Sequence, residues 1–324
     1  MSRNLALPDA RRLLDSVAQE LHRGLVGQDD LVRGLLIALL ADGHILIEGV
    51  PGLGKTRAVN LLAKICNLAF QRIQFTPDLL PADLVGTRVY DRETSGFRTV
   101  RGPVFTNLLL ADEINRAPAK VQSALLETMQ ERQVTIGRET QALPVPFRVF
   151  ATMNPIEQEG TYPLPEAQLD RFLLKLVVGY PKAEEERNIV RMVMDEVEAP
   201  DLEALLEPAD VSALAETTRS IHVESALVDY ATELVQATRR PADYKLELGP
   251  YVELGASPRA SIALVQAARA IAVLDGRAQV VPDDVKAVAR GVLRHRILIT
   301  YVGQAESVTS ESIVAEILET VKVP

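Results

Sequence analysis

The chain has 324 residues, 47% of them apolar, which is enough for one large domain or two domains with a sizeable core. Its net charge of −9 argues against tight non-specific binding to nucleic acid, because such binding depends on basic surface. The single cysteine excludes an internal disulfide, and with neither a signal-peptide pattern nor an apolar run of about 18 residues, we expect a cytoplasmic protein without membrane insertion.

The first half of the sequence predicts alternating strands and helices. Helices are expected at 8–24, 28–42, 56–68 and 118–131, and strands at 44–48, 70–75, 108–111, 150–152 and 173–178. Two hairpins, around Ser95-Gly96 and around Gly137, interrupt this order. Continuous apolar strands are typical of a parallel sheet covered on both faces, so we predict an α/β fold.

Beyond Pro181 the pattern changes to helices alone. They are expected at 184–196, 208–220, 224–239, 258–274, 282–296 and 309–321. We therefore predict an α/β core over residues 1–181, followed by an all-helical domain over residues 182–324.

The glycine-rich segment after the first strand carries the clearest functional signal. Its eight residues match the phosphate-binding pattern G-x-x-x-x-G-K-[ST] and are Gly49, Val50, Pro51, Gly52, Leu53, Gly54, Lys55 and Thr56. Glycines let consecutive N–H groups turn toward a phosphate, and the helix that follows points its positive end at the same anion. We expect Lys55 to contact the β- and γ-phosphates and the Thr56 hydroxyl to hold Mg²⁺. The flanking strand and helix make a chance glycine-rich turn a poor alternative.

An acidic pair ends the strand at 108–111. Asp112 and Glu113 lie where open α/β sheets bind ligands, so we expect Asp112 to hold Mg²⁺ and Glu113 to polarise the attacking water. Without the phosphate loop, surface carboxylates would explain the pair equally well. ATP is favoured over GTP, because the D-x-x-G match at residues 83–86 is not followed by an N-K-x-D segment.

Two further polar residues are candidates for phosphate contact. Asn154 follows a buried strand and can hydrogen-bond a γ-phosphate or the attacking water, although it can equally well start a turn with Pro155. Ser257 is a natural helix N-cap and Pro258 a natural first residue, so Arg259 lies in the first turn. A cation is disfavoured there unless it shares an anion with the helix, and the alternative is a solvated arginine.

In this order, the phosphate loop, Asp112-Glu113, Asn154 and Arg259 resemble Walker A, Walker B, sensor 1 and sensor 2 of the AAA+ ATPases. Four segments resemble the MoxR family within that class: 112-DEINRA-117, 151-ATMNP-155, 169-LDRF-172 and 255-GASPRA-260. The resemblance implies a core with a five-stranded sheet and a helical lid. It also implies that Val26, Gly27 and Gln28 border the adenine and that Arg171 is an arginine finger.

The same resemblance implies a ring, usually a hexamer, that uses ATP to mature or activate partner proteins, often ones with von Willebrand factor A domains. Two other functions stay open. The segment 88–101 has four arginines against two acids, which would suit a DNA-acting motor, although a solvated hairpin is the simpler interpretation. The other is a nucleotide-gated binding module without hydrolysis, and Glu113 argues against it.

Overall fold

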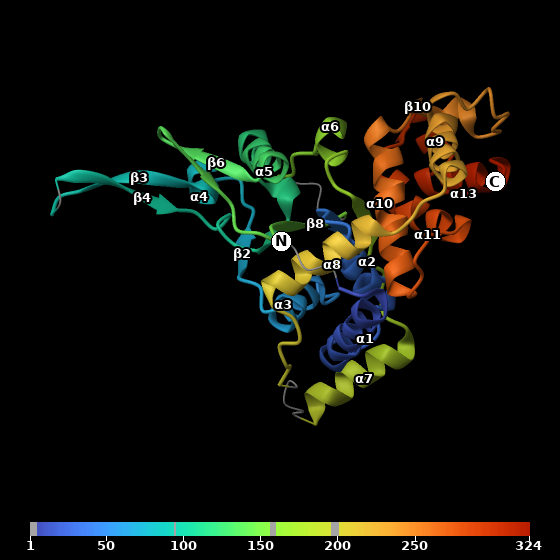
Figure 1. The fold of residues 1–324 in the computed structure, drawn as a ribbon. Coiled ribbons are helices and arrows are strands. Elements are labelled where there is room, and N and C mark those ends of the chain that lie inside the picture. The colour runs from blue at the N-terminus through green and yellow to red at the C-terminus, as the bar shows by residue number, and fades with distance from the viewer. Residues whose placement is uncertain (1–4, 94, 156–159, 196–200) are drawn as a thin grey trace.

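The computed structural model describes residues 5–93, 95–155, 160–195 and 201–324, and a parallel five-stranded sheet lies at its centre (Figure 1). The strand order is β2-β5-β8-β1-β9, which confirms the predicted α/β core. The strands are β1 (Ile45–Glu48), β2 (Phe70–Gln74), β5 (Leu108–Asp112), β8 (Arg148–Met153) and β9 (Leu174–Val177).

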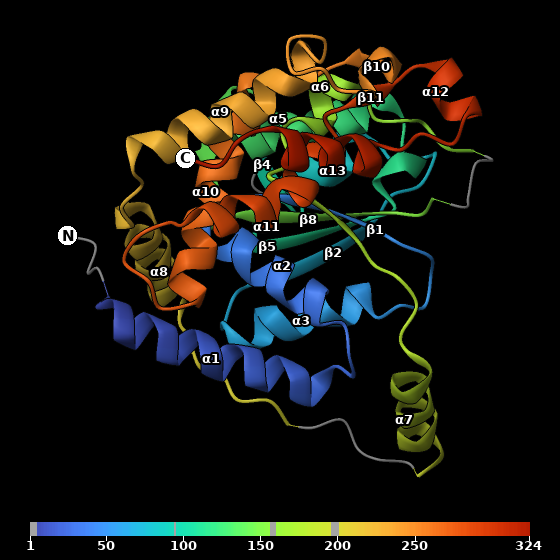
Figure 2. The same ribbon diagram turned by 90° about the vertical axis from the view of Figure 1, so that its right-hand side faces the viewer.

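The strands are buried on both faces because their alternate side chains enter two different clusters. Ile45 and Ile47 of β1 pack with α1 (Leu7–Gly24), α2 (Asp29–Leu40) and α3 (Lys55–Ile65). Leu46, between them, faces the cluster that includes α5 (Ala119–Glu131). This is the two-residue period of a strand placed between two helical layers. Figure 2 shows α1, α2 and α3 together on one side of the strands.

The helical half agrees with the prediction in its longer elements. They are α7 (Ala183–Met194), α8 (Pro208–Ser220), α9 (Ser225–Arg239), α10 (Pro258–Leu274), α11 (Pro282–Leu293) and α13 (Ser310–Thr320). The predicted end of the first of these, at residue 196, lies outside the described residues. None of the helices in the described ranges is long and apolar enough to cross a membrane.

The prediction of helices alone beyond Pro181 was wrong in detail. A two-stranded sheet joins β10 (Val252–Leu254) to β11 (Leu298–Ile299), and a short helix, α12 (Tyr301–Ala305), follows it. Elements of two to five residues have too few positions to show a period. One hydrophobic cluster continues from α1–α3 into α10, α11 and α13, so the two halves share a core, and the boundary at 181 stays a prediction.

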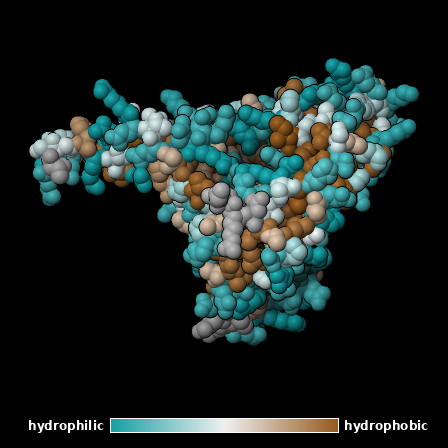
Figure 3. All heavy atoms as spheres, viewed as in Figure 1, coloured by the Kyte–Doolittle hydropathy of each residue, from teal (hydrophilic) through white to brown (hydrophobic). Residues whose placement is uncertain are grey.

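Both predicted hairpins are present, whereas two short helices, one before the first hairpin and one before β9, were not predicted. The first hairpin is β3 (Gly86–Asp91) with β4 (Gly96–Arg101), and the second is β6 (Gln133–Ile136) with β7 (Glu139–Ala142). The short helices are α4 (Pro81–Val85) and α6 (Glu166–Leu169). The β3–β4 hairpin projects from the body as a thin arm (Figure 1), and hydrophilic and hydrophobic residues are mixed on its surface (Figure 3).

A buried histidine stabilises the start of the sheet. The Val149 N–H donates to Nδ1 of His44 at 2.9 Å, and Nε2 of His44 lies 3.2 Å from the Met129 carbonyl oxygen, so the neutral ring with its proton on Nε2 satisfies both partners. Burial, together with the nearby Arg148 and Arg132, lowers the pKa of His44 to about 3.

This histidine should make folding sensitive to acid. An unfolded histidine has a pKa of about 6.5, so the stability that the neutral ring contributes is complete above that pH and is lost as the pH falls toward about 3. The loss is at most about 1.4 kcal/mol for each pH unit. Urea unfolding of the wild type and His44→Gln at pH 7 and pH 5 measures it. The stability difference between the two proteins should shrink at pH 5, and an unchanged difference would contradict this account.

Candidate active site

The phosphate loop runs from the end of β1 into the N-terminus of α3. Gly52 and Gly54 have φ values of 86° and 76°, a left-handed backbone that side chains disfavour. A Cβ atom built on either would meet no atom of the described residues within 4 Å, so the loop borders open space. At Gly49 the reason is a close approach, since a Cβ atom there would lie 2.8 Å from the Val178 carbonyl oxygen. The loop has the shape and the opening that a phosphate requires.

Lys55 and Thr56 begin α3 and face this loop. The half-buried Lys55 ammonium donates a hydrogen bond to the Gly49 carbonyl oxygen, and burial lowers its pKa. The Thr56 hydroxyl donates to Oδ2 of Asp112 at 3.4 Å. The lysine therefore already points back across the loop, and the hydroxyl connects α3 to the end of β5.

Asp112 is buried at the end of β5 and is held on both carboxylate oxygens. Its Oδ1 accepts from the Thr152 hydroxyl at 2.5 Å, and its Oδ2 accepts from Nε and Nη2 of Arg72 at 2.9 and 2.7 Å. A hydroxyl and a carboxylate are the oxygen ligands that Mg²⁺ prefers, so Thr56 and Asp112 fit that ion. The Arg72 guanidinium holds the same oxygen, so a metal ion at Asp112 has to compete with it.

Glu113 follows Asp112 with a left-handed backbone, at φ 56°. Its N–H donates to the Thr152 hydroxyl at 2.9 Å, while its Oε2 accepts from Nε2 of Gln74 at 2.7 Å and from Nη1 of Arg116 at 3.1 Å. These contacts hold the carboxylate at the edge of the sheet where β1 ends. A carboxylate held at this position can accept a proton from water.

Asn154 lies beside the phosphate loop, as the sequence predicts. It is 5% exposed and directly follows β8, whose Met153 is paired with Glu48 at the end of β1. The Gly49 N–H donates to the Met153 carbonyl oxygen at 3.2 Å. The phosphate loop, Asp112, Glu113 and Asn154 therefore meet at the carboxyl ends of three neighbouring strands.

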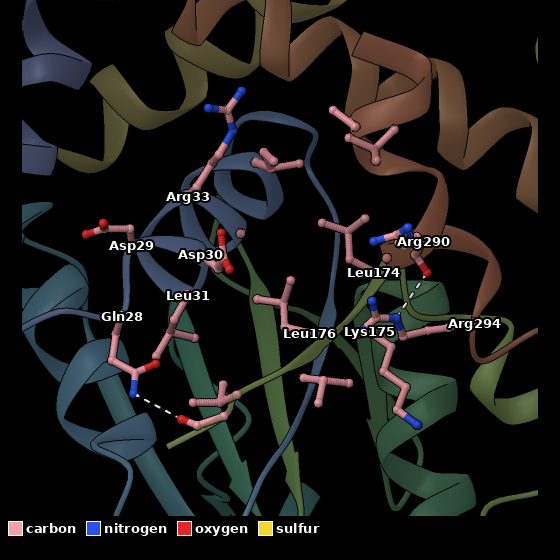
Figure 4. Close-up of a pocket in the computed structure, with 18 of the residues that line it drawn as sticks. Gln28, Asp29, Asp30, Leu31, Arg33, Leu174, Lys175, Leu176, Arg290 and Arg294 are labelled. Carbon is pink, nitrogen blue, oxygen red and sulfur yellow. Dashed lines mark hydrogen bonds between the residues drawn. The ribbon is translucent and has the colours of Figure 1, made fainter. Parts of the chain in front are cut away.

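The segment that includes Val26 and Gly27 packs against the chain that leaves β9. A Cβ atom at Gly27 would lie 2.5 Å from the Glu185 carboxyl carbon, and Nε2 of Gln28 donates to the Gly179 carbonyl oxygen at 3.4 Å. A cavity of about 660 Å³ opens here between α2, β9 and α11 (Figure 4). Gln28 lines this cavity, and so does Val178, which packs on Gly49, whereas Val26, Gly27 and the phosphate loop itself do not line it.

Arg171 and Arg259 lie together in a second cavity, of about 280 Å³. Nη1 of Arg171 donates to the Leu126 carbonyl oxygen at 2.7 Å, and Nη1 of Arg259 lies 3.9 Å from Oδ2 of Asp170. The side chain of Ser257 accepts from the Arg259 N–H at 3.1 Å, which confirms the predicted N-cap of α10.

This second cavity is at the opposite edge of the sheet from the phosphate loop. β9 begins at Leu174, which is paired with Ile45 at the start of β1, whereas the phosphate loop follows Glu48 at its end. Arg171 precedes β9, and Gly43 and His44, which precede β1, also line this cavity. Four strand residues at about 3.3 Å each separate the two edges. The predicted residues of one chain therefore form two separate sets, one around the phosphate loop and one that contains Arg171 and Arg259.

Several side chains of the site were not predicted. Arg72 and Gln74 lie two residues apart at the carboxyl end of β2, so their side chains are on the same face of the sheet. Polar side chains at the carboxyl end of a strand often belong to a ligand site, so the sequence could have identified them. Thr152 lies one residue before the end of β8 and contacts both Asp112 and Glu113. Arg296 contacts Asp170 and Phe172, each more than a hundred residues away, so no local pattern identifies it as part of the site.

Comparison with known proteins agrees with this arrangement. Residues 44–174 match the model of the ATPase family associated with various cellular activities, and residues 248–317 match that of an AAA lid domain. Chaperone MoxR1 of Mycobacterium tuberculosis is 50% identical over 96% of this chain and 82% of its own length. Protein MoxR of Methylorubrum extorquens is 33% identical over 90% of each chain.

The fold has a close counterpart among solved structures. The crystal structure of a candidate ATPase from Cytophaga hutchinsonii is 46% identical, covers 98% of this chain and 97% of its own, and superposes with a TM-score of 0.92. With the phosphate loop, the acidic pair and the lid in the expected places, the chain belongs to the MoxR family of AAA+ ATPases.

Proposed function

We propose that this chain hydrolyses ATP at sites completed by a neighbouring copy of itself. Lys55 and the loop N–H groups bind the β- and γ-phosphates, and the cavity beside Gln28 takes the adenine. Mg²⁺ held by Thr56 and Asp112 would neutralise charge on the phosphate oxygens. Glu113 takes the proton of the attacking water, and Asn154 orients that water or the γ-phosphate.

The position of Arg171 supports a shared site. A transferred phosphoryl group gains from one more cation, and Arg171 is a candidate for it. Arg171 and the phosphate loop lie at opposite edges of one sheet, so the Arg171 of one subunit can approach only the loop of another. Arg259 lies in the same cavity, so we propose that both arginines contact the neighbour's phosphates.

A ring, usually a hexamer in this class, satisfies this geometry at every interface. Each subunit then presents its Arg171 to the phosphate loop of one neighbour and receives the Arg171 of the other neighbour at its own loop. By analogy with the chaperone named among its relatives, we propose that the ring remodels partner proteins. Proteins with von Willebrand factor A domains are the proposed partners.

The direct test of a shared site is the dependence of activity on protein concentration. ATPase activity per subunit should rise as subunits assemble, in step with the mass measured by light scattering. Activity per subunit that stays constant down to the dilute monomer would contradict the proposal.

Lys55→Ala should abolish nucleotide binding. The substitution removes the only side-chain cation of the phosphate loop, while Gly52 and Gly54 keep their backbone. Titration with a fluorescent ATP analogue measures the loss. Lys64→Ala, in the last turn of the same helix, is the matched control and should bind like the wild type. Wild-type affinity in Lys55→Ala would reject the assigned role.

Arg259→Ala should weaken ATP more than ADP, and only in assembled protein. Its proposed partner is the γ-phosphate of a neighbour, which ADP lacks. Binding of both nucleotides should be measured above and below the concentration at which subunits assemble. Equal losses for ATP and ADP would show that Arg259 contacts another phosphate or only packs.

A further inference from the structure

Asp170 touches both segments that carry the proposed arginines. It directly precedes Arg171, and its side chain is 15% exposed. Its Oδ2 accepts from the Ser257 hydroxyl at 2.7 Å and lies 3.9 Å from Nη1 of Arg259. Ser257 caps α10 two residues before Arg259, so the Asp170 carboxylate joins the segment that carries Arg171 to the start of that helix.

Arg296 reinforces the same junction from the lid. Its side chain is 2% exposed, and its Nε donates to Oδ1 of Asp170 at 2.8 Å. Its Nη2 donates to the carbonyl oxygens of Asp170 and Phe172 at 3.1 and 2.6 Å. The Asp170 carboxylate thus accepts from both the capping serine and this buried arginine. The main chain on either side of Arg171 is held by the lid as well.

We propose that Asp170 is a positioning residue that holds Arg171 and Arg259 as one unit for the phosphates of the neighbouring subunit. The inference rests on the proposed function. Two cations that approach one triphosphate act together only if their separation is set beforehand, since ordering them during the reaction would cost free energy. Asp170 sets it, because the carboxylate contacts one cation and adjoins the other in sequence.

Asp170→Asn keeps the size of the side chain and removes its charge. The matched control is Asp284→Asn, because Asp284 also joins a lid-helix start to an arginine. Its carboxylate accepts from Arg277 at 2.6 and 2.7 Å and from the Val281 N–H at 2.8 Å, and it does not line the cavity that holds Arg171. Both variants should lower the Tm, because both weaken a charged hydrogen bond at a helix start.

The two variants should differ in turnover. At saturating ATP and full assembly, kcat of Asp170→Asn should fall roughly 10- to 100-fold, the size expected for displaced catalytic groups. Its KM for ATP should rise no further than that of assembled Arg259→Ala, because its own phosphate loop is intact, and Asp284→Asn should keep the wild-type kcat. In an Arg259→Ala background, Asp170→Asn should lower kcat by a smaller factor than it does in the wild type, because Asp170 acts partly through Arg259. A purely structural role would lower Tm in both variants and kcat in neither.

Mixing with Glu113→Gln separates this inference from the proposed function. Glu113→Gln subunits carry an intact Asp170 and Arg171, so they should restore turnover at the sites of Asp170→Asn and of Arg171→Ala alike. Recovery in the Arg171→Ala mixture only, or wild-type kcat in Asp170→Asn, would overturn the proposed role of Asp170 and leave the shared site standing. If neither mixture recovers, the shared site is wrong as well.

Discussion

Arg171→Ala should bind ATP and assemble, yet hydrolyse ATP roughly 10³- to 10⁵-fold more slowly than the wild type. The phosphate loop, Asp112 and Glu113 of the variant are unchanged and lie at the other edge of the sheet, so ATP affinity should hold. What is lost is a cation that meets charge developing on the transferred phosphoryl group, a loss of about 4 to 7 kcal/mol in transition-state stabilisation.

The measurement is steady-state hydrolysis at protein concentrations where light scattering shows full assembly. Arg138→Ala removes an exposed arginine at the turn between β6 and β7, and it should hydrolyse ATP like the wild type. Arg171→Lys keeps the charge but not the planar fork of donors, so it should recover only part of the rate. A fully assembled Arg171→Ala with wild-type turnover would remove Arg171 from the mechanism.

Glu113→Gln should keep ATP affinity and lose turnover by about 10²- to 10⁴-fold. The amide has the shape of the carboxylate but cannot take a proton from water, and it leaves the phosphate loop untouched. Glu127→Gln, an exposed position on α5, is the control and should turn over normally. Binding titration and single-turnover hydrolysis separate the two effects. Normal turnover in Glu113→Gln would reject its assignment as the base.

The sheet could be predicted because its strands are continuous apolar runs that two helical layers cover. Leu108 to Ala111 are all fully buried, as four consecutive apolar residues in a strand predict. The small sheet of β10 and β11 could not be predicted, because β11 has only two residues and its partner lies more than forty residues away. Tertiary pairing rather than local propensity decides such short strands.

The phosphate-loop half of the site could be predicted because its parts follow strand ends, and parallel strands place their ends at one edge. The arginine half could not be located in the same way. Sequence spacing places Arg259 at a helix start but does not say which edge of the sheet that helix approaches. It also does not show that Asp170 contacts Arg259 and Arg296, which lie far from it in the sequence.

The most direct test of a site shared between subunits is to mix two inactive variants. Arg171→Ala and Glu113→Gln are expressed separately, combined and allowed to exchange subunits, and ATP hydrolysis is followed over time. An interface between them can pair an intact Glu113 with an intact Arg171, so activity should appear well above that of either variant alone and grow with exchange. A mixture no more active than the sum of its parts, with exchange verified by labelled subunits, would contradict catalysis shared between subunits.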